Sequence, residues 1–126
     1  MVVRNFNLIL IIIVSSCAVA NDSDAIKINN QLSACISVAN KTIIKEGVIS
    51  VFSFDLEVKR PIAECGCKSA LGSYAVYSST KDYTSYIIGG KVGFMTSARK
   101  YLPLSVEENL INKRELIIEF SCAQPD

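Results

Sequence analysis

Hydrophobic and polar residues alternate with a period of two along much of this chain. Apolar residues take every second position in residues 52–58 and again in residues 116–122. This alternation is typical of strands that bury one face and expose the other. Shorter strand-like runs lie between them, at residues 62–67, 74–78, 83–88 and 91–96. The pattern predicts a domain built from several short strands.

Turn-forming residues separate the runs. Gly89-Gly90 lies between two of them and predicts a tight two-residue hairpin. Residues 102–106 also alternate, but Pro103 has no N–H to donate, so this run is expected at a sheet edge or at a bulge. Because no long helix is evident, the fold class predicted is all-β: an antiparallel β-sandwich, either immunoglobulin-like or a partly open barrel.

The segment of residues 28–39 is ambiguous. Its apolar positions fit helical spacing through Ile28, Leu32 and Cys35, and strand spacing through Leu32, Ile36 and Val38. Val38 and the following run of residues 42–44 are rich in β-branched side chains. Since such side chains favour strands, a first strand is the expectation here.

The start of the chain has the organisation of a signal peptide. Arg4 precedes an unbroken apolar run at residues 8–14, and Ala18-Val19-Ala20 supplies a small-residue cleavage site. The run is too short to span a bilayer, which takes about 20 apolar residues. We therefore expect a signal peptide at residues 1–20 and a single β domain at residues 21–126, in the periplasm or secreted.

A second way of processing the chain stays open at Cys17. The residues before it, Val14-Ser15-Ser16, resemble a bacterial lipobox, in which the cysteine becomes the lipidated first residue. Cleavage after Ala20 would release the protein, whereas lipidation of Cys17 would make it a membrane-anchored lipoprotein. Contact with a membrane is expected only in the second case.

Composition excludes several classes of function. Loss of residues 1–20 removes Arg4 and no acid, so 13 basic residues become 12, equal to the 12 acidic ones. A neutral chain without a basic cluster is not expected to bind nucleic acid. The chain has no histidine, which removes Ser-His-Asp and Cys-His catalysis and His-ligated zinc. Asp55 and Glu57 fall on the polar side of a strand, where carboxylates are ordinarily just solvated. No catalytic residue, cofactor or metal is therefore expected.

Four cysteines remain after residue 20, and they form the next candidate site: Cys35, Cys65, Cys67 and Cys122. An even number in a small exported domain predicts two disulfides, in one of three possible connectivities. On a strand, Cys65 and Cys67 would point to one face and cross the core to separate partners, with Cys122 as one and Cys35 as the other. The alternative is that Cys65-Gly66-Cys67 binds Cu(I) or exchanges disulfides.

Tyrosines concentrate in residues 72–86, among Ser, Thr and Gly. The candidates for contact with a partner are Tyr74, Tyr77, Tyr83 and Tyr86. Tyrosine gives a large contact area at low entropic cost, as in antibody paratopes. The alternative is that these residues simply suit the solvent face of a hairpin. Tyr74 and Tyr77 have opposite parity, so without a bulge they cannot line one surface.

Three short motifs carry a resemblance to a known family. They are residues 60–69, with the string RPIAECGCKS, residues 102–104 and residues 121–126. Together they resemble a family of small exported bacterial proteins known only as a domain of unknown function, over roughly residues 51–126. The resemblance implies an envelope location and brings no activity.

These observations together predict a non-enzymatic binding module. A small, rigid, disulfide-linked scaffold suits an inhibitor-type protein that binds another envelope or extracellular protein. The runner-up is a periplasmic Cu(I)-binding or thiol-disulfide protein acting through Cys65 and Cys67. A third class is a structural subunit that assembles through an open edge strand.

Overall fold

The computed structural model describes residues 26–111 and 114–124, and these residues form two β-sheets joined by short loops and 3-10 turns. The predicted signal peptide, with Cys17, lies outside the described residues. In chain order the elements are β1 (Ile26–Asn30), β2 (Ile36–Glu46), β3 (Ile49–Val58), η2 (Ile62–Cys65), β4 (Leu71–Ser79), β5 (Thr84–Gly93), β6 (Ala98–Ser105), η3 (Glu108–Leu110) and β7 (Glu115–Cys122).

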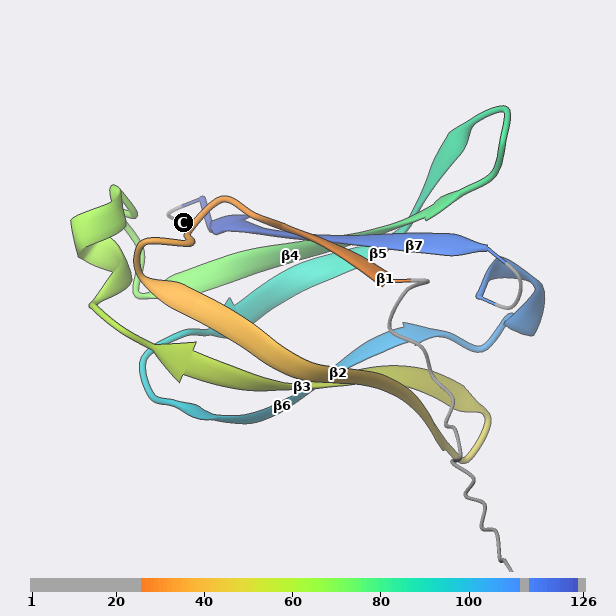
Figure 1. Ribbon diagram of the computed structural model, residues 1–126, viewed down its shortest axis with the longest axis horizontal. Helices are drawn as coiled ribbons and strands as arrows, with labels where there is room; N and C mark the ends of the chain where they lie inside the picture. Colours follow the sequence, from red (N-terminus) through yellow and green to blue (C-terminus); the bar gives the residue numbers. More distant parts are fainter. Residues whose placement is uncertain (1–25, 112–113, 125–126) are drawn as a thin grey trace, which may run out of the picture.

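The two sheets pack face to face as a sandwich (Figure 1). One sheet has four strands in the order β1-β7-β4-β5, and the other has three in the order β2-β3-β6. Neither sheet closes on itself, so the all-β sandwich is confirmed and a closed barrel is excluded. The antiparallel prediction needs one correction, because β1 runs parallel to β7. The four-stranded sheet is therefore mixed.

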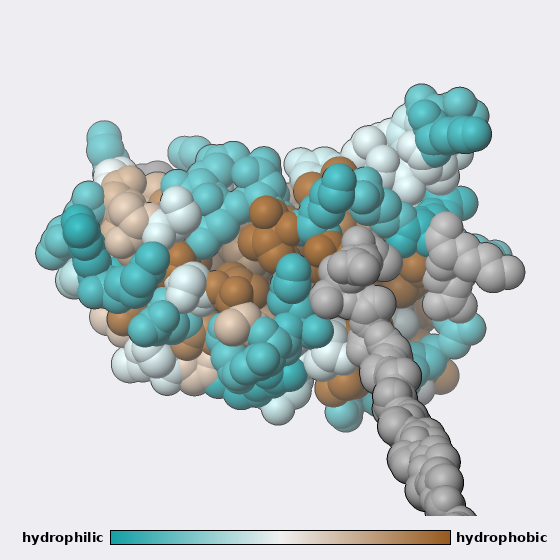
Figure 2. Space-filling view, in the orientation of Figure 1, coloured by the Kyte–Doolittle hydropathy of each residue, from teal (hydrophilic) through white to brown (hydrophobic). Residues whose placement is uncertain are grey.

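The core lies between the facing sides of β3 and β7. The alternation predicted for both strands is confirmed: Phe52, Phe54 and Leu56 are buried on one sheet, and Leu116, Ile118 and Phe120 on the other. The ring centroids of Phe54 and Phe120 lie 5.5 Å apart, so these side chains join the two sheets directly. Figure 2 shows apolar atoms reaching the surface between the edge strands β1 and β2.

Phe94 fills the core beside β4 and explains a glycine there. It is fully buried, and its ring centroid lies 5.5 Å from that of Phe120. A Cβ added to Gly72 would lie 2.1 Å from Phe94 Cδ2. No larger residue fits at this point of β4 unless the ring moves.

The expected hairpin at Gly89-Gly90 is wrong, because both glycines lie within the continuous strand β5. β4 and β5 are joined instead by a turn in which the Thr80 N–H donates to the Tyr83 carbonyl at 2.9 Å. Gly90 pairs with Tyr74, and a Cβ at Gly90 would lie 3.3 Å from the Tyr74 ring. The glycines leave room for tyrosine side chains rather than turning the chain.

Residues 62–67 are not a strand, contrary to the expectation. Pro61 precedes the 3-10 turn η2, and Gly66 ends it with φ of 96°. Positive φ is open to glycine at little cost, so Pro61 and Gly66 together favour a short turn over a strand.

The ambiguous residues 28–39 form neither one helix nor one strand. β1 ends at Asn30, residues 31–35 turn, and β2 begins at Ile36. The Asn30 Oδ1 accepts the Leu32 N–H at 2.9 Å and shapes this turn. The edge strand expected at residues 102–106 is confirmed by β6, which among the described strands pairs with β3 alone. Within the described residues, no helix is long and apolar enough to cross a membrane.

Candidate functional site

Two disulfides gather at one end of the sandwich. Cys35 is bonded to Cys65, with a Cα–Cα distance of 6.3 Å, and Cys67 to Cys122, with 5.1 Å. The prediction that Cys65 and Cys67 take separate partners, with Cys122 as one of them, is confirmed. The strand geometry behind that prediction is wrong, since the left-handed Gly66 separates the two cysteines.

The segment between β3 and β4 bridges the two sheets through these disulfides. Cys35 lies directly before β2 in the three-stranded sheet, and Cys122 ends β7 in the four-stranded sheet. The residues around η2 are therefore tied covalently to both layers. This fixes the position of a segment that has little regular structure of its own.

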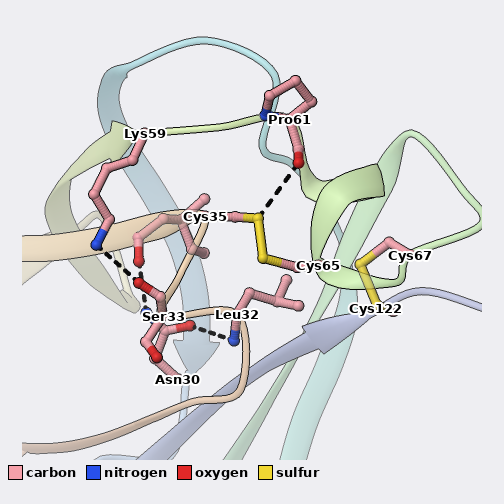
Figure 3. The surroundings of a disulfide bond; sticks show 10 residues. Asn30, Leu32, Ser33, Cys35, Lys59, Pro61, Cys65, Cys67 and Cys122 are labelled. Carbon is pink, nitrogen blue, oxygen red and sulfur yellow. Dashed lines mark hydrogen bonds between the residues drawn. A yellow bond between two sulfur atoms is a disulfide. The ribbon is translucent and has the colours of Figure 1, made fainter.

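Hydrogen bonds to backbone carbonyl groups also hold the start of this segment (Figure 3). The Cys35 carbonyl accepts the N–H groups of Lys59 at 2.7 Å and Arg60 at 3.2 Å. Lys59 Nζ donates to the Ser33 carbonyl at 2.8 Å. The Pro61 carbonyl oxygen lies 3.3 Å from Cys35 Sγ, and because that sulfur is bonded and carries no proton this is a close contact rather than a hydrogen bond.

A pocket of about 560 Å³ opens beside η2. Its apolar lining includes Ile62 and Phe94, which are buried, and Met95, which is 69% exposed. The basic residues Lys59, Arg60 and Lys68 also line it.

Sequence reasoning missed this pocket. Lys59 and Arg60 before residues 61–67, and Lys68 after them, are visible in the sequence, but nothing there places Phe94 and Met95 beside them.

The four candidate tyrosines do not form one surface. Tyr74 is 6% exposed and belongs to the core, so its expected part in partner contact needs correction. The Tyr74 side chain lies on the inner face of β4, together with those of Val76 and Ser78. Burial raises the pKa of the Tyr74 hydroxyl, and nearby Tyr86 raises it further.

The other three tyrosines lie on the hairpin formed by β4 and β5. Tyr83 and Tyr86 are each 62% exposed. Tyr77 pairs with Tyr86 across the strands, and their rings meet edge to face with centroids 5.8 Å apart. A Cβ at Gly89 would lie 2.7 Å from the Tyr86 hydroxyl, so that hydroxyl lies over Gly89. We call Tyr77, Tyr83 and Tyr86 the tyrosine surface.

The carboxylates considered for catalysis have structural partners. Asp55 Oδ2 accepts a hydrogen bond from Asn40 at 2.6 Å, and Oδ1 accepts one from Arg99 at 2.9 Å. These two bonds hold the pKa of Asp55 below its ordinary value. Glu57 accepts a hydrogen bond from Ser37 at 3.0 Å. This arrangement links β2, β3 and β6 on the outer side of their sheet.

Neither a metal site nor a free dithiol is found where the structure describes the chain. No group of three or more His, Cys, Asp or Glu residues is placed to hold a metal ion in residues 26–111 and 114–124. The sulfurs of Cys65 and Cys67, the alternative Cu(I) ligands, are each bonded to a different partner.

One comparison with known proteins returns a match. A family model described as an uncharacterized protein conserved in bacteria, DUF2195, matches residues 11–125. The match extends further toward the N-terminus than the resemblance seen in the short motifs. No curated protein and no solved structure matches the chain.

Proposed function

The chain belongs to the bacterial family DUF2195. We propose that it is an exported, non-enzymatic module that binds another protein of the cell envelope or outside the cell. Two disulfides in a small domain support export, because disulfides persist in oxidising compartments. The observation that carries the binding proposal is the tyrosine surface. It presents two exposed aromatic rings on a scaffold whose two layers are linked covalently.

The geometry of the tyrosine surface suits recognition. The tip of the β4–β5 hairpin projects away from the two sheets (Figure 1). Tyr86 rests against Tyr77 with ring centroids 5.8 Å apart, so its ring is positioned before a partner arrives. Tyrosine is enriched among residues that dominate binding energy, and a preformed ring loses less entropy on binding.

We expect the variant Tyr83→Ser/Tyr86→Ser to lose most of its affinity for the partner. Residues of this kind contribute about 2 kcal/mol or more each, so loss of both should lower the affinity roughly a thousandfold and remove most capture from an envelope extract. The immobilised protein is incubated with the extract of its source bacterium, and each retained protein is quantified by mass spectrometry. A thermal melt of the same variant measures stability.

The matched control is Tyr101→Ser. Tyr101 is 59% exposed but lies on β6, in the other sheet. Tyr101→Ser should retain the partner. In the thermal melt, Tyr83→Ser alone should have the same melting temperature as the unaltered protein. Tyr86→Ser also removes the contact with Tyr77, which lowers stability by about 1 kcal/mol. Equal loss in Tyr101→Ser, or no loss in the double variant, would argue against this surface.

Export is tested separately by intact mass measured on protein purified from its own bacterium. We expect a chain that begins at Asn21, and a mass gain on reduction equal to two hydrogens for each of two disulfides. A mass that includes a lipid on Cys17 would assign the protein to a membrane surface instead. An unprocessed chain, or free thiols at Cys65 and Cys67 with bound copper, would contradict the proposal.

A further inference from the structure

The pocket beside η2 combines an apolar lining with a positive rim. Its volume of about 560 Å³ falls within the roughly 300–1,000 Å³ of small-molecule sites. Ile62, Phe94 and Met95 line it. Ile62 and Phe94 are buried in the core, whereas 69% of the Met95 surface is exposed. Such an interior favours an apolar ligand, because covering Met95 removes apolar surface from water.

The walls of the pocket are fixed before any ligand arrives. Cys67 lines the pocket and is bonded to Cys122, and the Cys35 carbonyl holds the backbone of Lys59 and Arg60. In addition, the Ser97 Oγ accepts the Val58 N–H at 2.9 Å and ties the loop that carries Met95 to the end of β3. A preformed site avoids part of the entropic cost of binding.

The charges around the pocket are of one sign. Among its lining residues in the described part of the chain, Lys59, Arg60 and Lys68 are basic and none is acidic. Glu64, on η2, does not line it. Lys59 already donates to the Ser33 carbonyl. Arg60 and Lys68 form no ion pair with any residue that the structure describes, so both are available to an anion.

We propose that this pocket binds a small anionic amphiphile, a molecule with an apolar body and one carboxylate. The apolar body lies against Met95, next to the buried side chains of Ile62 and Phe94, and the carboxylate meets Arg60 and Lys68 at the rim. The inference goes beyond the proposed protein binding and does not depend on it. The pocket adjoins the disulfides, whereas the tyrosine surface lies on the projecting hairpin at the other end of the molecule (Figure 1).

Met95 provides a local reporter of binding. The chain has two methionines, Met1 and Met95, so methyl-labelled protein gives a simple spectrum in which Met95→Leu assigns the signal. Octanoate, octanol and octyltrimethylammonium share one chain length and differ in the charge of the head group. Each is titrated below its micelle-forming concentration. We expect octanoate to shift the Met95 methyl resonance with saturation, octanol to bind more weakly, and octyltrimethylammonium to leave the resonance in place.

Charge-reversal variants locate the carboxylate. Arg60→Glu/Lys68→Glu should weaken octanoate binding by about fivefold or more. Each exposed charge contact contributes a modest part of the binding free energy, and the variant reverses two such charges. Lys81→Glu is the matched control, since Lys81 is exposed in the distant turn between β4 and β5. All three positions are exposed, so thermal melts should be unchanged. Binding should also weaken as salt concentration rises.

Three outcomes would overturn the proposal. One is that octyltrimethylammonium shifts Met95 as strongly as octanoate does. Another is that Arg60→Glu/Lys68→Glu binds octanoate no less tightly than Lys81→Glu. The third is that the Met95 resonance does not respond to octanoate at all. None of these results bears on capture of a partner by the tyrosine surface, so the two proposals fail separately.

Discussion

We expect the variant Cys67→Ala/Cys122→Ala to lose about 4 kcal/mol of unfolding free energy, because the lost disulfide closes a loop between residues 55 apart in sequence. In the chain-entropy model the bond acts by limiting the freedom of the unfolded chain. Natural domains are stable by only about 5–15 kcal/mol, so the loss is a large part of the total. Urea unfolding monitored by tyrosine fluorescence gives the free energy by linear extrapolation.

The second disulfide serves as a graded comparison. Cys35→Ala/Cys65→Ala opens a loop with a sequence separation of 30, for which the same model gives about 3.6 kcal/mol. Both cysteines of a pair are replaced together so that no free thiol is left to exchange. A loss below about 1 kcal/mol in either double variant would show that the disulfides contribute little to stability.

Replacement of Phe120 by alanine should cost about 3–5 kcal/mol, the range for large aromatic residues in a core. Phe120 is fully buried on β7, and its ring centroid lies 5.5 Å from those of both Phe54 and Phe94. Its removal therefore leaves a cavity between the two sheets. The measurement is the same urea titration, with the disulfides intact.

The control for Phe120→Ala is Tyr101→Ala, on the outer side of the three-stranded sheet. Tyr101 is 59% exposed, so its replacement should change the free energy by about 0.5 kcal/mol or less. Phe120→Leu fills most of the space and should cost clearly less than Phe120→Ala. A cost for Phe120→Ala as small as that of Tyr101→Ala would mean that the two sheets pack without it.

The sequence was most informative where one strand face is buried. In residues 52–58 and 116–122 every second residue is apolar, and both segments are strands with the expected residues in the core. The alternation arises because each strand has one side against the other sheet. The alternation gives no information about which strand lies next to which in a sheet. The parallel pairing of β1 with β7 could therefore not be predicted.

The predictions that proved wrong concern residue types that can serve two different structural purposes. Two adjacent glycines suit a tight turn, but Gly89 and Gly90 in β5 instead leave room for the side chains of Tyr86 and Tyr74. For Gly90, that use depends on Tyr74 in the opposite strand β4, which local sequence does not reveal. Likewise, Cys65 and Cys67 were assigned to a strand by their spacing, although Pro61 and Gly66 favour the 3-10 turn that is found.

The candidate sites were predictable to different degrees. The exposure of Tyr83 and Tyr86 fits a polar turn near residue 81, and the burial of Tyr74 follows from its parity with Val76. The pocket was not predictable, because it forms where residues 58–70 meet Phe94 and Met95. Such a site depends on the route of the chain between the two sheets.

The parallel pairing of β1 with β7 also sets the order in which this domain can be completed. Ile26 pairs with Leu116, so the first described strand needs the last one as its neighbour. β7 also lies between β1 and β4 in the sheet order, so β4 and β5 remain an isolated hairpin until β7 has been synthesised. Contacts between residues this far apart in sequence form slowly. The growing polypeptide therefore stays without its larger sheet until β7 has been synthesised.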